Sequence, residues 1–95
     1  MEMTFTGEVI SWRGPSPYHF VPLPVSVCDA IAVVAPQVSY GWGVIPVTAT
    51  IGVTSFTTSL FPKDGGYLLP LKDAVRRAEG LDVGDSMTAT VVIAP

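Results

Sequence analysis

The chain has 95 residues, of which 48% are hydrophobic and only 14% are charged, and its formal net charge is −3. This length suffices for one domain with a modest core and excludes a second domain. Because about 25% of the residues in ordinary soluble domains are charged, part of the apolar surface here is expected to meet another subunit. The acidic balance repels phosphate backbones, so nucleic acid is not an expected partner.

Cysteine usage and hydropathy predict the cellular setting. Cys28 is the only cysteine, so no internal disulfide can form, which is typical of a reducing compartment. Residues 30–62 carry no charge, but proline, glycine, serine and threonine interrupt them, so they predict buried strands rather than a membrane span. The sequence starts with polar and apolar alternation instead of a basic and apolar leader. We therefore expect a cytoplasmic protein that does not associate with membranes.

The N-terminal part predicts a β-hairpin. Apolar and polar residues alternate over residues 3–9, which predicts a strand that runs to about Trp12 with its apolar face in the core. Residues 13–17 have the composition of a loop. Residues 18–21 then resume as a second strand that ends at Pro22, because proline cannot donate to a strand ladder.

A first helix is predicted over residues 26–34. Ser26, followed three residues later by Asp29, resembles a capping box, and the apolar residues up to Pro36 have the spacing of one helical face. The high valine content disfavours a helix, so a strand over the same residues is the alternative. A connector rich in glycine and aromatic residues follows over residues 38–43.

The central part predicts two further strands and a tight turn. β-branched residues dominate residues 44–51, where Pro46 favours an edge or bulged position. Residues 56–61 alternate at the period of a strand. Residues 62–66 contain the Asp-Gly pair of a hairpin turn, which leads into the next strand.

The C-terminal part predicts a strand, a helix and a strand. Residues 67–69 form a short apolar run, and Pro70 is expected to end that strand because it lacks an N–H group. Residues 71–79 are rich in helix formers, and Gly80 stands where a helix end favours a left-handed residue. After a tight turn, the alternation over residues 87–92 predicts the last strand.

The predicted fold class is mainly β. We expect a small closed or partly split β-barrel of about six strands, with two short helices that plug its ends. The second helix is expected to turn one apolar stripe toward the barrel, because its apolar residues are spaced by four, three and three positions. These residues are Leu71, Val75, Ala78 and Leu81.

Motifs distributed over nearly the whole chain carry a family resemblance. They include Trp12-Arg13-Gly14, Tyr18-His19-Phe20-Val21, Gly41-Trp42-Gly43, Thr58-Ser59-Leu60-Phe61-Pro62, Gly66-Tyr67-Leu68-Leu69-Pro70-Leu71-Lys72 and Gly84-Asp85. The chain thereby resembles the bacterial domain-of-unknown-function family nineteen-oh-five (DUF1905). The resemblance implies a small, partly split β-barrel, which occurs alone or beside a bacteriocin-resistance-like domain. It implies no activity and no catalytic residues.

A looser resemblance gives a different alternative. Residues 69–85 are similar to the strand, helix and strand of the swapped-hairpin transcription regulators. Those regulators bind DNA as basic dimers, whereas this chain is acidic. DNA binding is therefore the second alternative function.

The residues that could support catalysis are His19, Thr58, Ser59 and Cys28. His19 is the only histidine and lies between two aromatic residues, while a strand hydroxyl needs a base and an oxyanion site to act as a nucleophile. Structural roles are expected for all four, including inert packing for Cys28. A small hydrolase or isomerase that uses Ser59, Thr58 or His19 is the first alternative. No catalytic residue and no cofactor is predicted. No metal site is predicted either, because the carboxylates never fall at the spacing of a metal loop.

The basic and tryptophan residues suggest a ligand site at the barrel mouth. If Asp73 pairs with Arg77 at i,i+4, Lys72 and Arg76 lack counter-charge, and an anion shared by both would relieve their repulsion. Lys63 could join them from its loop, and a tryptophan would supply a flat apolar wall. The predicted ligand-binding residues are Trp12, Arg13, Trp42, Lys72 and Arg76.

The favoured function is a non-enzymatic module. It is expected to bind a small anionic ligand or a protein partner, as a monomer or a homodimer. The sequence does not identify the ligand, the partner or the process.

Overall fold

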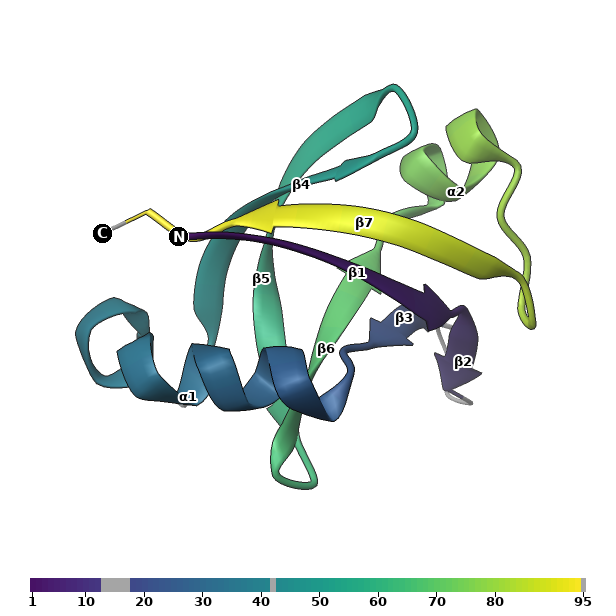
Figure 1. Ribbon diagram of the computed structural model, residues 1–95. Coiled ribbons are helices and arrows are strands. Elements are labelled where there is room, and N and C mark those ends of the chain that lie inside the picture. The colour runs from purple at the N-terminus through teal and green to yellow at the C-terminus, as the bar shows by residue number, and fades with distance from the viewer. Residues whose placement is uncertain (13–17, 42, 95) are drawn as a thin grey trace.

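The computed structural model describes residues 1–12, 18–41 and 43–94, and its main element is one antiparallel sheet (Figure 1). The strands are β1 (Glu2–Glu8), β2 (Ile10–Trp12), β3 (Tyr18–Pro22), β4 (Ile45–Ile51), β5 (Thr54–Lys63), β6 (Gly66–Leu71) and β7 (Ser86–Val92), and the helices are α1 (Val25–Val38) and α2 (Asp73–Glu79). Across the sheet the strands follow the order β1, β7, β4, β5, β6, β3, β2. The sheet curls into a half-barrel, which confirms the mainly β prediction, with seven strands instead of six.

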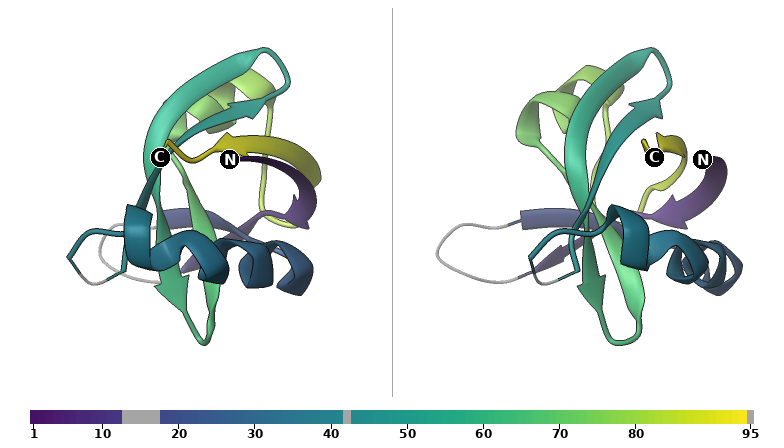
Figure 2. Two further views of the ribbon diagram at one scale, coloured as in Figure 1. Left: turned by 60° about the vertical axis from the view of Figure 1, so that its left-hand side comes forward. Right: turned by 90° about the vertical axis from the view of Figure 1, so that its left-hand side faces the viewer.

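The helices lie on opposite sides of the half-barrel. Figure 2 shows α1 near the tip of the β5–β6 hairpin and α2 near the tip of the β4–β5 hairpin. Neither helix, within the ranges described, is long and apolar enough to cross a membrane.

The first predicted strand is divided at Val9, and its alternation changes phase there, since Phe5 is buried whereas Ser11 is exposed. β1 pairs with β7, whereas β2 pairs with β3 to form the predicted hairpin. At this division, Val9 N donates to Asp85 O at 2.9 Å, and Gly84 N donates to Val9 O at 2.9 Å. β1 and β2 are the two edge strands of the sheet, and only the fully buried Val9 separates them in the chain. Because the chain links both edges of the sheet at Val9, the sheet curls.

β5 changes its pairing partner along its length, and the barrel is split at this change. Residues 54–60 of this strand pair with β4, and residues 61–63 pair with β6. The registered pairing of β6 with β5 therefore stops at Leu68, while β6 continues along β3. Lys72 Nζ reaches β5 from the end of β6 by donating to Thr57 O at 3.0 Å. This arrangement agrees with the partly split barrel that the resemblance implied.

The prediction that Pro70 ends its strand is wrong. β6 runs through Pro70 to Leu71, and Pro70 is registered with Phe20 of β3. Proline is tolerated here because the pairing with β5 has already ended at Leu68, so only one side of β6 still needs partners. The helix accordingly starts at Asp73 rather than at residue 71.

The first helix is longer than predicted and starts without the predicted cap. Pro24 is its N-cap residue, no side chain caps it, and Ser26 lies inside the first turn. Proline suits this position because its fixed φ is compatible with a helix start, and its carbonyl accepts from Cys28 N at 3.0 Å. The helix also continues through Pro36, since Ser39 N still donates to Ala35 O at 2.9 Å. The strand alternative is therefore wrong, and the predicted connector starts later.

The second helix closes as predicted but exposes one residue of the predicted stripe. Gly80 is left-handed with φ 63°, and Leu81 N donates to Arg76 O at 2.9 Å. Leu71 and Val75 are buried, and Leu81 is half-buried against the core. Ala78 is exposed, so the buried side of the seven-residue helix is narrower than the predicted stripe.

The core is formed by the inner sides of the strands and by one side of α1. α1 contributes Cys28 and Ile31, and the last strand contributes Met87, Ala89 and Val91. The burial of these last three residues confirms the alternation predicted for that strand. Fully buried side chains include Val9, Val21, Ile31, Ile45, Leu60, Leu69, Val91 and Ile93.

The turn between β4 and β5 gives a first testable prediction. Gly52 has φ 58°, and a Cβ atom there would overlap the carboxylate of Glu79, which accepts from Thr54 Oγ1 at 2.6 Å. We expect Gly52→Ala to lower the free energy of unfolding by about 2–3 kcal/mol, because it combines left-handed strain with loss of this hydrogen bond. Urea denaturation followed by circular dichroism measures this change.

Gly80→Ala is the matched control. Gly80 has a similar φ of 63°, but nothing lies within 4 Å of the added Cβ atom. This variant should therefore show only the backbone cost of about 1–2 kcal/mol. Equal losses in the two variants would mean that Glu79 does not hold this turn.

Candidate functional site

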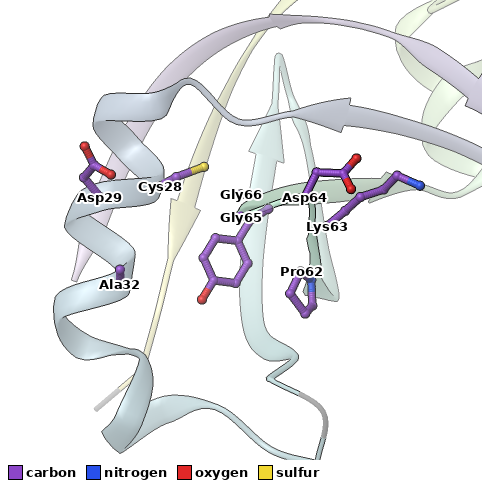
Figure 3. Close-up of a pocket in the computed structure, with 9 residues that line it drawn as sticks. Cys28, Asp29, Ala32, Pro62, Lys63, Asp64, Gly65 and Gly66 are labelled. Carbon is purple, nitrogen blue, oxygen red and sulfur yellow. The ribbon is translucent and has the colours of Figure 1, made fainter.

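Two adjoining pockets lie on either side of the tip of the β5–β6 hairpin. One has a volume of about 360 Å³ and lies between the hairpin and α1 (Figure 3), and the other has a volume of about 310 Å³ and lies between the hairpin and β2. Lys63, Asp64, Gly66 and Tyr67 line both pockets. Because they share this wall, we call the two pockets together the hairpin groove.

The tip of the β5–β6 hairpin is a two-residue turn. Lys63 is registered with Gly66, so only Asp64 and Gly65 connect the strands. Both have positive φ, at 51° and 80°, which is the pattern of the turn that best matches the twist of paired strands. Aspartate and glycine are the residues that adopt this conformation readily, so the predicted turn is confirmed with its physical basis.

The α1 side of the groove holds the only thiol. Cys28 is buried, and its Sγ donates to Leu23 O at 3.5 Å. Figure 3 shows Cys28 pointing from α1 toward the hairpin at Gly65 and Gly66. A Cβ atom on Gly66 would lie 3.4 Å from Cys28 Sγ, so glycine leaves this side of the groove open. The remaining residues that line this side are Asp29, Ala32 and Pro62.

The β2 side of the groove is built around Trp12. Its ring centroid lies 4.8 Å from that of Phe20 and 6.3 Å from that of Phe61, the latter in an edge arrangement. Lys63 Nζ lies 3.8 Å from the centroid of the Trp12 ring, which is well within the range of a cation–π interaction. Figure 3 shows Lys63 and Asp64 extending away from α1, and both line this side. The other lining residues are Ile10, Pro22, Leu23 and Leu68.

The predicted ligand-binding residues do not all fall in this groove. Trp12 lines its β2 side, whereas Arg13 and Trp42 lie outside the described residues. Arg76 lines a separate pocket of about 170 Å³ at the end of α2, together with Arg77 and Asp82. A shared anion site at Lys72 and Arg76 stays a prediction.

The expected lack of counter-charge is wrong for Arg76. Arg76, not Arg77, pairs with Asp73 at 3.4 Å, and it also pairs with Asp82 at 3.7 Å. Asp82 was missed because it lies beyond the helix, where the i,i+4 rule does not apply. The ammonium of Lys72 donates to the Thr57 carbonyl, so it ties α2 to the sheet.

The histidine considered for catalysis lies on a different strand from the two hydroxyl groups. Thr58 and Ser59 are on β5, His19 is on β3, and β6 lies between these strands in the sheet. His19 Nδ1 is buried without a hydrogen-bond partner, and none of the hydrogen bonds among the described residues joins it to Thr58 or Ser59. His19 is therefore not placed as a base for either hydroxyl group in the described structure.

Metal binding has no obvious place in the described part of the chain. There, no three histidine, cysteine, aspartate or glutamate side chains gather so that they could hold a metal ion. In the groove itself, the titratable side chains of Asp29, Lys63 and Asp64 are exposed, and that of Tyr67 is half-buried. The charged side chains of the groove are therefore accessible to solvent.

A comparison with protein families identifies the chain. The profile of the family described as "Domain of unknown function (DUF1905)" matches residues 5–91. The chain belongs to the DUF1905 family. The match runs from Phe5 in β1 to Val91 in β7, so the DUF1905 region contains both helices and the whole hairpin groove. A search of curated proteins gives no match.

Sequence reasoning missed several groove residues of this DUF1905 domain. The sequence patterns assign Gly66 only to a turn, Tyr67 only to a strand and Cys28 only to packing. The turn signal located the hairpin correctly, but it could not show that α1 and β2 would flank the tip. That neighbourhood depends on the order of the strands in the sheet, which local patterns do not encode.

Proposed function

We propose that this protein is a non-enzymatic module that binds a small ligand in the hairpin groove. The observation that carries the proposal is the pair of adjoining pockets with one shared wall. Each has a volume near the lower end of the range of about 300–1,000 Å³ that is usual for small-molecule sites. Apolar residues with a few polar groups line the β2 side, as is also usual for such sites.

The chemistry of the groove favours binding over catalysis. A covalent mechanism needs a nucleophile activated by a neighbouring base. The thiol of Cys28 is buried and donates to a backbone carbonyl. The ammonium of Lys63 lies over an aromatic ring. These contacts hold both groups in binding or packing roles.

A blocking substitution tests the proposal. Ile10 is half-buried on β2 and lines the groove, so Ile10→Phe should fill part of it. In ¹H–¹⁵N NMR titrations with benzoate, benzyl alcohol and benzylamine, at least one probe should shift the amides of Lys63, Gly65 and Gly66 in a saturable way. Ile10→Phe should weaken that binding about tenfold, which corresponds to a loss of about 1.4 kcal/mol.

The matched control is the neighbouring residue on the same strand. Ser11 is exposed, and its side chain points to the opposite side of β2 from that of Ile10, so Ser11→Phe adds the same ring outside the groove. This variant should bind as the unmodified protein does. Saturable shifts confined to residues outside the groove, or no binding of any probe at millimolar concentration, would refute the proposal.

A further inference from the structure

We infer that the β2 side of the hairpin groove takes a planar ring that carries one carboxylate. The ring would lie on Trp12, and the carboxylate would pair with Lys63. This inference rests on the proposed function and names the chemical class of its ligand.

Trp12 is suited to bind a ring because its own position is fixed. Phe20, which is only 8% exposed, and Phe61 contact it from β3 and β5. Lys63 is an exposed residue at the end of β5, and its flexible side chain lies over the ring. If Lys63 moves aside, the indole presents a flat surface to the pocket that Ile10 and Leu68 also line. Stacking on a fixed aromatic ring is a favourable way to bind a planar ligand.

Lys63 is suited to bind the carboxylate because its ammonium lies beside Trp12 and forms no ion pair with the described residues. Lys72 and Arg76 are already engaged elsewhere, since Lys72 donates to Thr57 O and Arg76 pairs with Asp73 and Asp82. No carboxylate of the described residues lies within ion-pair distance of Lys63 Nζ. An ammonium–carboxylate contact is a charge-assisted hydrogen bond, which is stronger than a hydrogen bond between neutral groups. A ligand with both groups would therefore draw Lys63 off the ring and occupy the uncovered surface.

The acidic residues around the groove favour a ligand with one negative charge over a ligand with two. Asp64 is exposed next to Lys63 and lines the same side, and Asp29 lines the α1 side. The chain as a whole carries a net charge of −3. A phosphate with two charges would meet more repulsion than a carboxylate with one. The preferred ligand is therefore an aromatic or similarly flat monocarboxylate.

Three matched probes test this class by NMR. They are phenylacetate, its neutral counterpart phenylacetamide, and phenyl phosphate. The readouts are the indole N–H signal of Trp12, assigned with a Trp42→Phe variant, and the amides of Lys63 and Gly66. Phenylacetate should bind about tenfold more tightly than phenylacetamide, and more tightly than phenyl phosphate, since one charge-assisted contact is worth about a factor of ten.

Charge variants separate the local pair from the overall charge. Lys63→Gln should remove the preference for phenylacetate over phenylacetamide. Arg77→Gln removes the same charge from an exposed position on α2 and should preserve the preference. Asp64→Asn should strengthen the binding of phenyl phosphate, because asparagine tolerates the φ of 51° while the repelling charge is gone.

The outcomes distinguish this inference from the proposed function. If phenylacetate and phenylacetamide bound with equal affinity and shifted the NMR signals of the groove, the inferred role of the carboxylate would be wrong, and the proposed function would stand. A preference for phenylacetate that survives Lys63→Gln would likewise overturn the role of Lys63. Absence of binding by all three probes would overturn the ligand class, and the titrations with Ile10→Phe would then decide the proposed function independently.

Discussion

Val75→Asp is expected to lower the free energy of unfolding by about 3–5 kcal/mol, the size of effect found when a buried charge has no partner. Val75 is only 4% exposed and is the buried residue of α2. A loss of this size approaches the whole stability of many small domains, which is about 5–15 kcal/mol. Urea denaturation followed by circular dichroism should show a clear drop in the midpoint, or a protein that is already unfolded without denaturant.

Ala78→Asp is the informative control for this helix. The sequence predicted that both residues face the barrel, but Ala78 is exposed. The same aspartate should therefore cost only about 1 kcal/mol there, from lower helix propensity and from a negative charge near the helix C-terminus. Similar losses in the two variants would show that α2 is turned so that both residues face the barrel.

Sequence periodicity predicted the strands well because one face of each strand packs in a single core. The alternation of β1 and of β7 leads directly to the burial of Phe5, Met87 and Ala89. The turn at Asp64 and Gly65 was also predictable, because few residues adopt positive φ. These features depend on residues close in the chain, so local patterns are enough to indicate them.

The incorrect predictions concern positions whose structure depends on distant neighbours. Pro70 continues its strand because β5 has already left that side of β6. The division at Val9 depends on hydrogen bonds to Gly84 and Asp85, more than 70 residues away in the numbering of the chain. α1 extends past Pro36 while it packs its Cys28 and Ile31 side against the core. No local pattern contains this information.

The candidate site was predictable only in part for the same reason. The sequence marked Trp12 as a wall for a ligand and included Lys63 among the cations of the mouth, and the structure places these two in contact. It grouped Trp12 with Arg76, which lines a different pocket. The pairing of Arg76 with Asp82 depends on how the chain turns after α2, so helical spacing alone could not reveal it.

Gly7→Val is expected to destabilise the protein by about 3 kcal/mol, although strand propensity alone predicts the opposite sign. Gly7 lies in β1 at the point where this strand passes close to β3. A Cβ atom there would lie 2.5 Å from Cγ1 of Val21 and 3.0 Å from the carbonyl oxygen of Pro22. Val21 is fully buried and Pro22 contributes backbone, so neither can move aside without disturbing the core. Thermal and urea unfolding measure the loss.

A double-mutant cycle with Val21→Ala identifies the cause. This second substitution removes the Cγ1 atom that the new side chain would meet, so Gly7→Ala should cost less in the Val21→Ala background than in the unmodified protein. The coupling should reach about 1 kcal/mol, as is usual for residues in direct contact. Gly65→Ala, where nothing lies within 4 Å of the added Cβ atom, should show no coupling to Val21→Ala. If Gly7→Val raised the stability, β1 and β3 would not be in close contact, and the half-barrel would be more open at this point than the structure shows.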